Sequence, residues 1–392
     1  MSSKKPSLLT LLLLIPFGSI SAVLFTPALP TIAKVLEVSD GAVEATMTFF
    51  LLGYALGNLL YGPLAKRFGR KPSIYLGATI AVLGSFVTIF AGDRQLFYLF
   101  VIGRFLSALG SSVGMKMSFT LIADAFRNAQ ITKKISIATV SFAVSPSIAV
   151  GVGGYLTTHY GWQSCFYALI VYSCLVLILS FFLPETAPSF DEDALTFKDI
   201  KETYRNNLRN KKLIYSSLIM GCVTSILYLF STLAAFLAIN QIGLSPEKYG
   251  FLNLIPPIGL VFGSFISHQL ANRKKKLAVI QLGGVIAVVV IISMVILFGI
   301  GKVNAWTLFL PIPFLYVGTS LIFNNASSFA MEHMKDKANG SAVMSFINMM
   351  LASLAVFITQ SVDSPSPLFM PLFFLFFAFF VLFLQKRLRA LI

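Results

Sequence analysis

The sequence predicts an all-α membrane protein with twelve transmembrane helices in two six-helix halves, and three observations indicate this fold. Of its 392 residues, 57% are hydrophobic and 11% are charged, whereas soluble domains carry about 25% charged residues. Apolar runs of about 20 residues recur along the chain, and each can cross a hydrocarbon core about 30 Å thick. Lys and Arg gather in every second loop, as they do when cytoplasmic loops retain positive charge.

The apolar runs between charge clusters define the predicted helices. In the first half, these are residues 8–33, 43–65, 73–91, 96–123, 135–156 and 162–183. In the second half, they are residues 213–239, 249–270, 277–300, 305–330, 341–361 and 368–384. The first run follows Lys4 and Lys5 but is longer than the apolar part of a signal peptide. We therefore interpret it as a helix that stays in the membrane.

The polar stretch 184–212 separates the two halves. We expect an amino-terminal half at 1–183, a cytoplasmic linker at 184–212 and a carboxy-terminal half at 213–392. An internal repeat supports this division, because GPLAKRFGRK after the second helix is echoed by GSFISHQLANRKKK after the eighth. With both termini in the cytoplasm, the outer loops hold only Lys34, Arg94, Lys248 and Lys302.

The charge pattern and the motifs argue against several other classes of protein. The net charge of +15 is scattered in short clusters, so no nucleic acid is expected as a partner. The cysteines, Cys165, Cys174 and Cys222, lie inside apolar runs and predict neither disulfides nor a metal site. No P-loop spacing occurs, and His159, His268 and His333 lie far apart near loops. We expect neither an ATP-driven pump nor an enzyme, and no cofactor.

The stretch FLLGYALGNLLYGPLAKRFGRKP at 50–72 resembles the signature between helices 2 and 3 of the major facilitator superfamily. It is most similar to the bicyclomycin/chloramphenicol-resistance (Bcr/CflA) family of drug:proton antiporters. Further similar pieces are PALPTIA, GRFLSALGSSVGM, SPSIAVGVGGYLTTHYGW, FLPET and GTSLIFNNASSFAM. The resemblance implies the major facilitator fold and a monomer in a bacterial inner membrane. It also implies alternating access around a central cavity, with protons as the coupling ion.

Two motifs carry this resemblance. In the loop after helix 2, glycines are expected to allow a tight turn, and basic residues to hold helix ends and headgroups; these are Gly62, Gly69, Arg67, Arg70 and Lys71. The family has an acid at position 66, where this chain has Lys66, and Asp124 is a candidate replacement. In helix 5, small residues and a proline resemble the antiporter motif that lets helices pack closely; these are Pro146, Gly153 and Gly154.

The charges inside the helices depart from the family pattern. Val23 stands where the family places an acid in helix 1. We expect no deeply buried carboxylate, since Glu44, Asp124 and Glu332 lie near helix ends, and Glu44 becomes the leading substitute for proton coupling. Arg104 matches the helix 4 arginine that the family uses to organise hydrogen bonds with helix 1. Lys116 is additional, and at mid-membrane a lysine costs about 2.5–3.5 kcal/mol. It either lines a cavity and attracts an anion or extends to the interface.

Polar and aromatic residues within the helices are the remaining substrate-binding candidates. In the first half these are Phe25, Tyr54 and Asn58, and in the second Tyr228, Asn253, Asn324, Asn325 and Asn348. Hydrogen bonding between helices is the alternative role for each asparagine.

Three functions stay open. The first is export of a small organic molecule or drug, and the second is a carrier of an organic anion such as a polycarboxylate metabolite or siderophore. The third is a nontransporting receptor or enzyme on the same scaffold.

Overall fold

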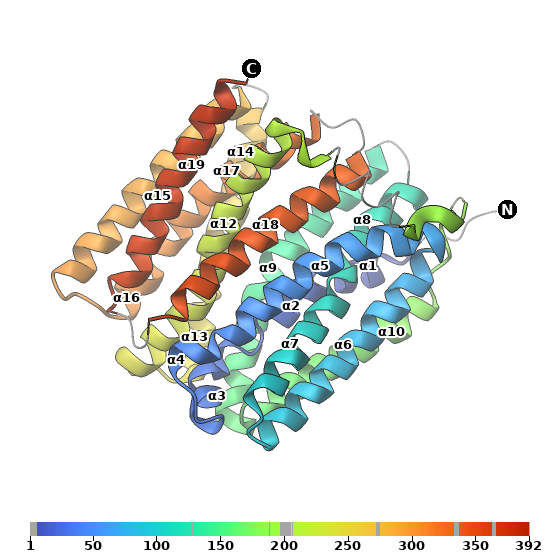
Figure 1. Cartoon of the computed structure of the whole chain (residues 1–392). Coiled ribbons are helices and arrows are strands. Elements are labelled where there is room, and N and C mark those ends of the chain that lie inside the picture. Colours follow the sequence, from blue (N-terminus) through green and yellow to red (C-terminus); the bar gives the residue numbers. More distant parts are fainter. Residues whose placement is uncertain are drawn as a thin grey trace.

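The computed structural model describes residues 6–126, 129–187, 189–196, 205, 207–271, 275–332, 337–362 and 366–391. These residues form a bundle of helices without any strand (Figure 1). Eleven helical segments of the described chain are long and apolar enough to cross a membrane. The one predicted span not among these eleven is helix 5, which corresponds to α9 (Ala129–Tyr160) and has 32 residues. The predicted all-α transmembrane fold is confirmed.

The first half contains six spans, several of them broken. Helix 1 comprises α1 (Leu8–Leu14), α2 (Phe17–Val23), η1 (Thr26–Ala28) and α3 (Leu29–Val35). The next spans are α4 (Asp40–Val43) with α5 (Ala45–Arg67), α6 (Arg70–Asp93), α7 (Phe97–Ser111) with α8 (Val113–Ala125), α9, and α10 (Gln163–Phe181). A short 3-10 turn, η2 (Glu192–Leu195), follows in the linker.

The second half repeats the pattern. It contains α12 (Lys211–Phe236) with the π-helical turn η3 (Leu237–Gln241), α13 (Pro246–Leu252) with α14 (Pro256–Ala271), and α15 (Lys276–Gly299). It continues with α16 (Ala305–Phe309), α17 (Pro311–Glu332), α18 (Lys337–Thr359) and α19 (Phe369–Arg389).

The helix breaks were not predicted, and prolines explain two of them. Pro27 has no N–H for the carbonyl of Val23, four residues earlier, and the Thr26 hydroxyl donates to that carbonyl instead, at 2.8 Å. Pro256 likewise follows the gap between α13 and α14. The predicted helix 5, 135–156, was too short at both ends, because α9 continues to Tyr160 and stops before Gly161, whose φ is 81°.

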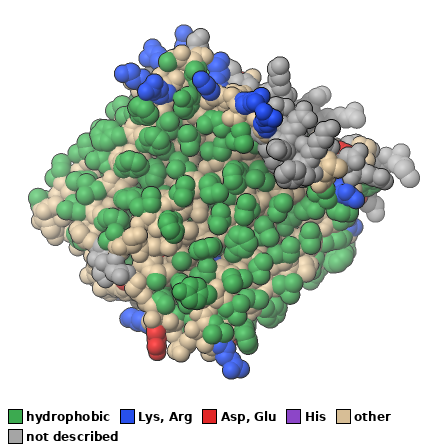
Figure 2. All heavy atoms as spheres, in the orientation of Figure 1, with side chains coloured by type: hydrophobic (Ala, Val, Ile, Leu, Met, Phe, Trp, Pro, Cys, Tyr) green, Lys and Arg blue, Asp and Glu red, His purple; other side chains and the backbone are tan. Residues whose placement is uncertain are grey.

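The two ends of the bundle differ in charge. One end carries the lysines and arginines near the start of α6, the start of α12 and the end of α19; we call it the basic end. The other, the opposite end, holds the turns between α3 and α4 and between α15 and α16 (Figure 1). Figure 2 shows hydrophobic side chains over the broad flank between the ends, as lipid contact requires.

Small residues set the closest contacts between helices. A Cβ at Gly110 of α7 would lie 2.4 Å from the backbone of α6, and one at Gly84 of α6 would lie 2.4 Å from the backbone of α7. In α9, a Cβ at Gly153 would lie 1.7 Å from the carbonyl oxygen of Leu24 in helix 1. A Cβ at Gly154 would lie 2.4 Å from the carbonyl oxygen of Pro246, which belongs to the other half. The backbones therefore approach as closely as glycine permits.

We expect Gly153→Ala to lower the apparent melting temperature, because the new methyl group overlaps the Leu24 carbonyl and overpacking costs about 1–3 kcal/mol. Gly151→Ala is the matched control on the same helix, since its Cβ would meet nothing closer than 3.6 Å. There the better helix propensity of alanine leaves stability equal or higher. Thermal unfolding in detergent measures both, and equal losses for the two variants would contradict the packing described here.

Candidate functional site

The turn between α5 and α6, at the basic end, is held by Glu185. The backbone N–H groups of Arg70 and Lys71 donate to its carboxylate at 3.1 and 3.0 Å, and those of Thr186 and Ala187 donate at 2.9 and 2.8 Å. Burial alone would raise the pKa of Glu185, but these four donors outweigh it and lower the pKa. The carboxylate also sits at the positive end of α6.

Glycine is required at the start of this turn. Gly69 has a φ of 101°, and a Cβ there would lie 2.6 Å from a carboxylate oxygen of Glu185. Glu185 was not predicted as a functional residue, although it is part of the FLPET piece. Its position as the one acid directly after the sixth apolar run was the available signal.

Arg70 and Asp124 form an ion pair beside this turn. Arg70 Nε lies 3.0 Å from Asp124 Oδ2, and the Thr186 hydroxyl donates to the same oxygen at 2.9 Å. Asp124 thus supplies an acid to the motif in which position 66 is an exposed lysine. Lys71 donates to the carbonyl of Phe181 at 2.8 Å, and the Arg67 guanidinium lies over the Phe68 ring.

Gly62 was expected to allow a tight turn in the loop after helix 2, and this expectation was wrong. Gly62 lies inside α5, more than a turn before the loop. A Cβ there would lie 2.7 Å from Lys116 Nζ, so the glycine makes room for a side chain from α8.

Lys116 packs against α5. Its ammonium group donates to the carbonyl of Asn58 at 2.8 Å, and Gly57 allows the two helices to approach, since a Cβ there would lie 1.9 Å from Ser112 Oγ. No carboxylate of the described chain lies within ion-pair distance of Lys116. The side chain is half-buried, and the partner observed for its charge is a neutral carbonyl.

Arg104 occupies the centre of the first half and is completely buried. It donates to the carbonyls of Ser21 and Ala22 at 3.0 and 3.3 Å, where α2 ends. Its guanidinium lies 3.9 Å from the ring centroid of Phe25 and 4.3 Å from that of Phe50. Phe25 is therefore part of the surroundings of Arg104 and, being fully buried, does not face a cavity in this structure.

Tyr54 and Tyr228 come from different halves and lie close enough to interact electrostatically. Tyr54 is buried and Tyr228 half-buried. Asn58, one turn along α5, uses its side chain amide to donate to the Tyr54 carbonyl at 3.1 Å. The structure thus brings two aromatic candidates together between the halves.

The asparagines of the second half differ in their bonding. Asn324 donates to Ser264 Oγ at 3.3 Å and Asn325 to Ser267 Oγ at 2.9 Å, so both join α17 to α14. Asn253 donates to Tyr249 O within its own helical segment at 2.8 Å. Asn348 is 4% exposed, and its Oδ1 has no partner. It is the member of this set with unused hydrogen-bonding capacity.

The expectation of no deeply buried carboxylate was wrong. Glu44 lies between α4 and α5 and is only 3% exposed. The hydroxyl of Thr359, at the end of α18, donates to its carboxylate. The apolar runs showed Glu44 near a helix end but could not show that the end of α18 covers it.

The contact of Glu44 with Thr359 belongs to a larger set that joins the halves at the opposite end. Ser353 donates to the Thr48 carbonyl at 2.9 Å, and Asn240 donates to Asp40 at 3.0 Å. On the other side of the interface, the backbone N–H of Glu247 donates to Thr158 Oγ1 at 3.2 Å. We call these contacts the junction. It brings α5 against α18, α3 against α12, and α9 against α13.

The sequence model of the Major Facilitator Superfamily matches residues 11–360. The chain belongs to the major facilitator superfamily. Its relatives include Multidrug resistance protein D of Escherichia coli K12, which is 27% identical over 83% of this chain and 80% of its own length. The Bicyclomycin resistance protein homolog of Haemophilus influenzae is 25% identical over 81% of this chain and 78% of its own length. The expected resemblance to the Bcr/CflA family is confirmed.

Solved structures show the same fold. The D-xylose-proton symporter has a TM-score of 0.73 at 14% identity, covering 97% of this chain and 96% of that one. A bacterial homolog of the human lysosomal transporter Spinster has a TM-score of 0.70, with the same identity and coverage. This member of the major facilitator superfamily is thus a multi-pass membrane transporter, and its relatives and fold are those of transporters rather than enzymes.

We expect Glu185→Gln to lower the apparent melting temperature of this transporter at pH 7 by about 1–2 °C, because the group is partly exposed and screened. The folded pKa of Glu185 lies below its ordinary value of 4.5. Its stabilisation is therefore fully present above pH 4.5 and is lost as the pH falls through the folded pKa. The difference between parent and variant should shrink below pH 4.5.

Thermal unfolding at several pH values measures this, with Glu37→Gln as the control for an exposed carboxylate at the opposite end. A difference for Glu185→Gln that grows as the pH falls would contradict the assignment.

Proposed function

We propose that the chain is a secondary-active exporter of small organic molecules, drugs among them, and that it works by alternating access in a bacterial inner membrane. The observation that carries the proposal is the junction. Side chains of both halves meet there through hydrogen bonds and close glycine contacts, which can separate without breaking any helix. The printed names of the relatives, multidrug and bicyclomycin resistance, supply the substrate class.

In this proposal the basic end faces the cytoplasm, both termini lie there, and the junction closes the periplasmic side. The rocking bodies are residues 1–183 and 213–392, joined by the linker 184–212, and the transporter works as a monomer. The placement follows from the preference of cytoplasmic loops for positive charge. Repeated halves around a central site are an established architecture for transporters.

The experiment that tests the export function begins with purified protein. A thermal-shift screen against cationic drugs, neutral drugs and polycarboxylates identifies a ligand, because binding to the folded state raises its stability. Vesicles under an imposed proton gradient then measure whether that ligand is moved. Stabilisation and gradient-driven export of a drug are expected. Stabilisation by polycarboxylates alone would contradict drug export.

We further propose that Glu44 carries the coupling proton in place of the family acid replaced by Val23. An ionised carboxylate is costly to bury without a positive partner, and the partner observed for Glu44 is the neutral hydroxyl of Thr359. Protonation of Glu44 from the periplasm therefore favours closure of the junction. In the proposed cycle the proton then leaves toward the cytoplasm while the junction is closed, and the buried ionised carboxylate favours reopening of the junction. This links the proton gradient to the change of conformation.

We expect Glu44→Gln to abolish the dependence of transport on the pH gradient while leaving ligand binding within about two-fold of the parent. Gln keeps the size and hydrogen bonding of protonated glutamate but cannot release a proton. Glu247→Gln is the control, since Glu247 is also at the junction but is much more exposed. An unchanged response to the gradient in Glu44→Gln would remove Glu44 as the coupling group, and gradient-independent transport by the parent would indicate facilitated diffusion.

A second candidate function is transport of an organic anion, such as a polycarboxylate or siderophore. The observation in its favour is the ammonium group of Lys116, which has a neutral carbonyl as its partner. A charge at this depth attracts an anion more strongly than it would in water.

We expect Lys116→Ala to weaken binding of a carboxylate ligand by more than about 1 kcal/mol, and Lys116→Arg to retain part of that affinity. Binding of neutral ligands should change much less. Titration calorimetry of the three proteins measures this. Equal carboxylate affinity in the parent and Lys116→Ala would reject the anion site and leave Lys116 as a side chain that only bridges α8 and α5.

A further inference from the structure

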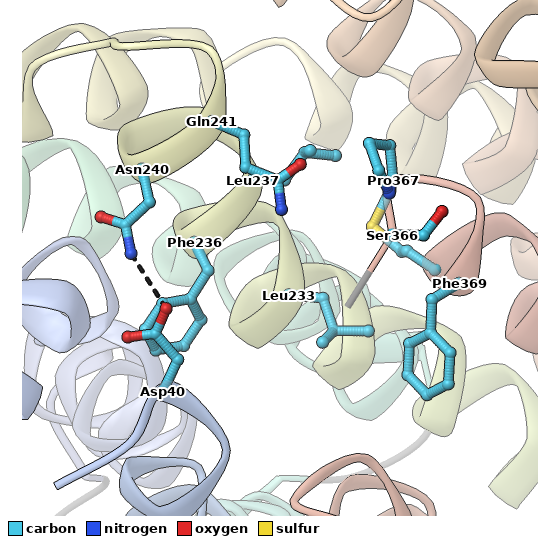
Figure 3. Close-up of a pocket in the computed structure, with 10 residues that line it drawn as sticks. Asp40, Leu233, Phe236, Leu237, Asn240, Gln241, Ser366, Pro367 and Phe369 are labelled. Atoms are coloured by element: carbon cyan, nitrogen blue, oxygen red, sulfur yellow. Dashed lines mark hydrogen bonds between the residues drawn. The ribbon is translucent and has the colours of Figure 1, made fainter. Parts of the chain in front are cut away.

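A pocket of about 250 Å³ lies at the opposite end, beside the contact between Asp40 and Asn240 in the junction. Its walls are the last turns of α12, the turn η3, the segment before α19 and the first turn of α19. Asp40, at the start of α4, completes it from the other half. Figure 3 shows Asp40 and Phe236 on one side and Phe369 with Ser366 and Pro367 on the other.

The chemistry of the pocket is that of an amphipathic cation site. Buried apolar side chains form its floor; these are Leu233, Phe236, Leu237 and Met370. Phe369, half-buried, adds a second aromatic ring. Asp40 is the charged residue among the described residues that line the pocket, and the side-chain amide of Asn240 donates to its carboxylate at 3.0 Å. A carboxylate beside aromatic rings is suited to a quaternary or tertiary ammonium group.

The pocket also depends on the conformation of the transporter. All lining residues except Asp40 belong to the second half, and Asp40 reaches them through the junction. When the halves separate at this end, the carboxylate leaves the aromatic wall and the site is divided. A ligand that contacts both parts therefore binds the closed junction more tightly than the open one, and it shifts the population toward the closed state.

We infer that this pocket is a second ligand site, distinct from the central cavity, for a small aromatic or alkyl ammonium ion that arrives from the periplasm and holds the junction closed. Such a site makes an external organic cation an inhibitor of turnover, because it stabilises the state that must open to release substrate. The inference rests on the orientation and the opening junction of the proposed function, but not on which molecule is exported.

The binding test uses benzyltrimethylammonium, which keeps its charge at every pH, and titration calorimetry of the purified full chain. We expect saturable binding that Asp40→Asn weakens about five- to ten-fold, because the charge is lost while an oxygen remains to accept from Asn240. The neutral isostere neopentylbenzene should bind the parent as weakly as the cation binds Asp40→Asn. Glu37→Gln, an exposed acid three residues away, should bind the cation like the parent.

Equal affinity of the cation for the parent and Asp40→Asn would overturn the site, as would equal affinity of the parent for the cation and its neutral isostere. Phe369→Leu gives an independent check, since it removes one ring without touching the charge. It should weaken binding of the cation, and an unchanged affinity would contradict the aromatic contact.

The conformational test places spin labels at Arg94→Cys and Lys302→Cys, both exposed at the opposite end and in different halves. Cys165, Cys174 and Cys222 are replaced first. Benzyltrimethylammonium added outside right-side-out vesicles should enlarge the short-distance population, and it should not do so in Asp40→Asn. A shift to longer distances, or the same shift in both proteins, would overturn the inference. A failed export assay would leave these results intact.

Discussion

The whole arrangement depends on one constraint, which is that lipid offers no hydrogen bonds to the backbone at breaks in a helix. Helix 1 is broken between α2 and α3, and Arg104 is buried where it can donate to the carbonyls of Ser21 and Ala22. The Thr26 hydroxyl satisfies the carbonyl that Pro27 cannot. With these groups satisfied, helix 1 can bend at mid-membrane and direct its second part toward the other half. A charge that would be costly alone thus stabilises the bend.

The junction follows from this bend. Leu24, beside the break, packs its carbonyl against Gly153 of α9, while the neighbouring Gly154 approaches Pro246 of the second half. Buried apolar side chains of both halves form one continuous core, and the hydrogen bonds of Thr48, Ser353 and Asp40 add local contacts between the halves. The basic end is organised separately, by Glu185 and the pair of Arg70 with Asp124 within the first half.

The positions of the membrane helices could be predicted from apolar runs, because a bilayer demands a minimum length of apolar chain. Asp124 was predictable as a partner in the loop motif, since Lys66 left that motif without its acid. Glu44 was not, because its burial depends on Thr359, which is 315 residues away in the sequence. Gly62 was misassigned for a similar reason, since its role is set by a lysine on another helix. Local pattern thus predicted the helices and the loop motif but could not show which helix ends meet.

The most direct test of this account is a reversible bond across the junction. Thr158 and Glu247 lie in different halves, and Glu247 N is 3.2 Å from Thr158 Oγ1. In a background without native cysteines, Thr158→Cys with Glu247→Cys should form a disulfide under mild oxidation, because the side chain of residue 158 contacts the backbone of residue 247. If the junction must open in every cycle, oxidation will stop transport and a reductant will restore it, whereas each single-cysteine variant will be unaffected. Full transport by quantitatively cross-linked protein would contradict the account.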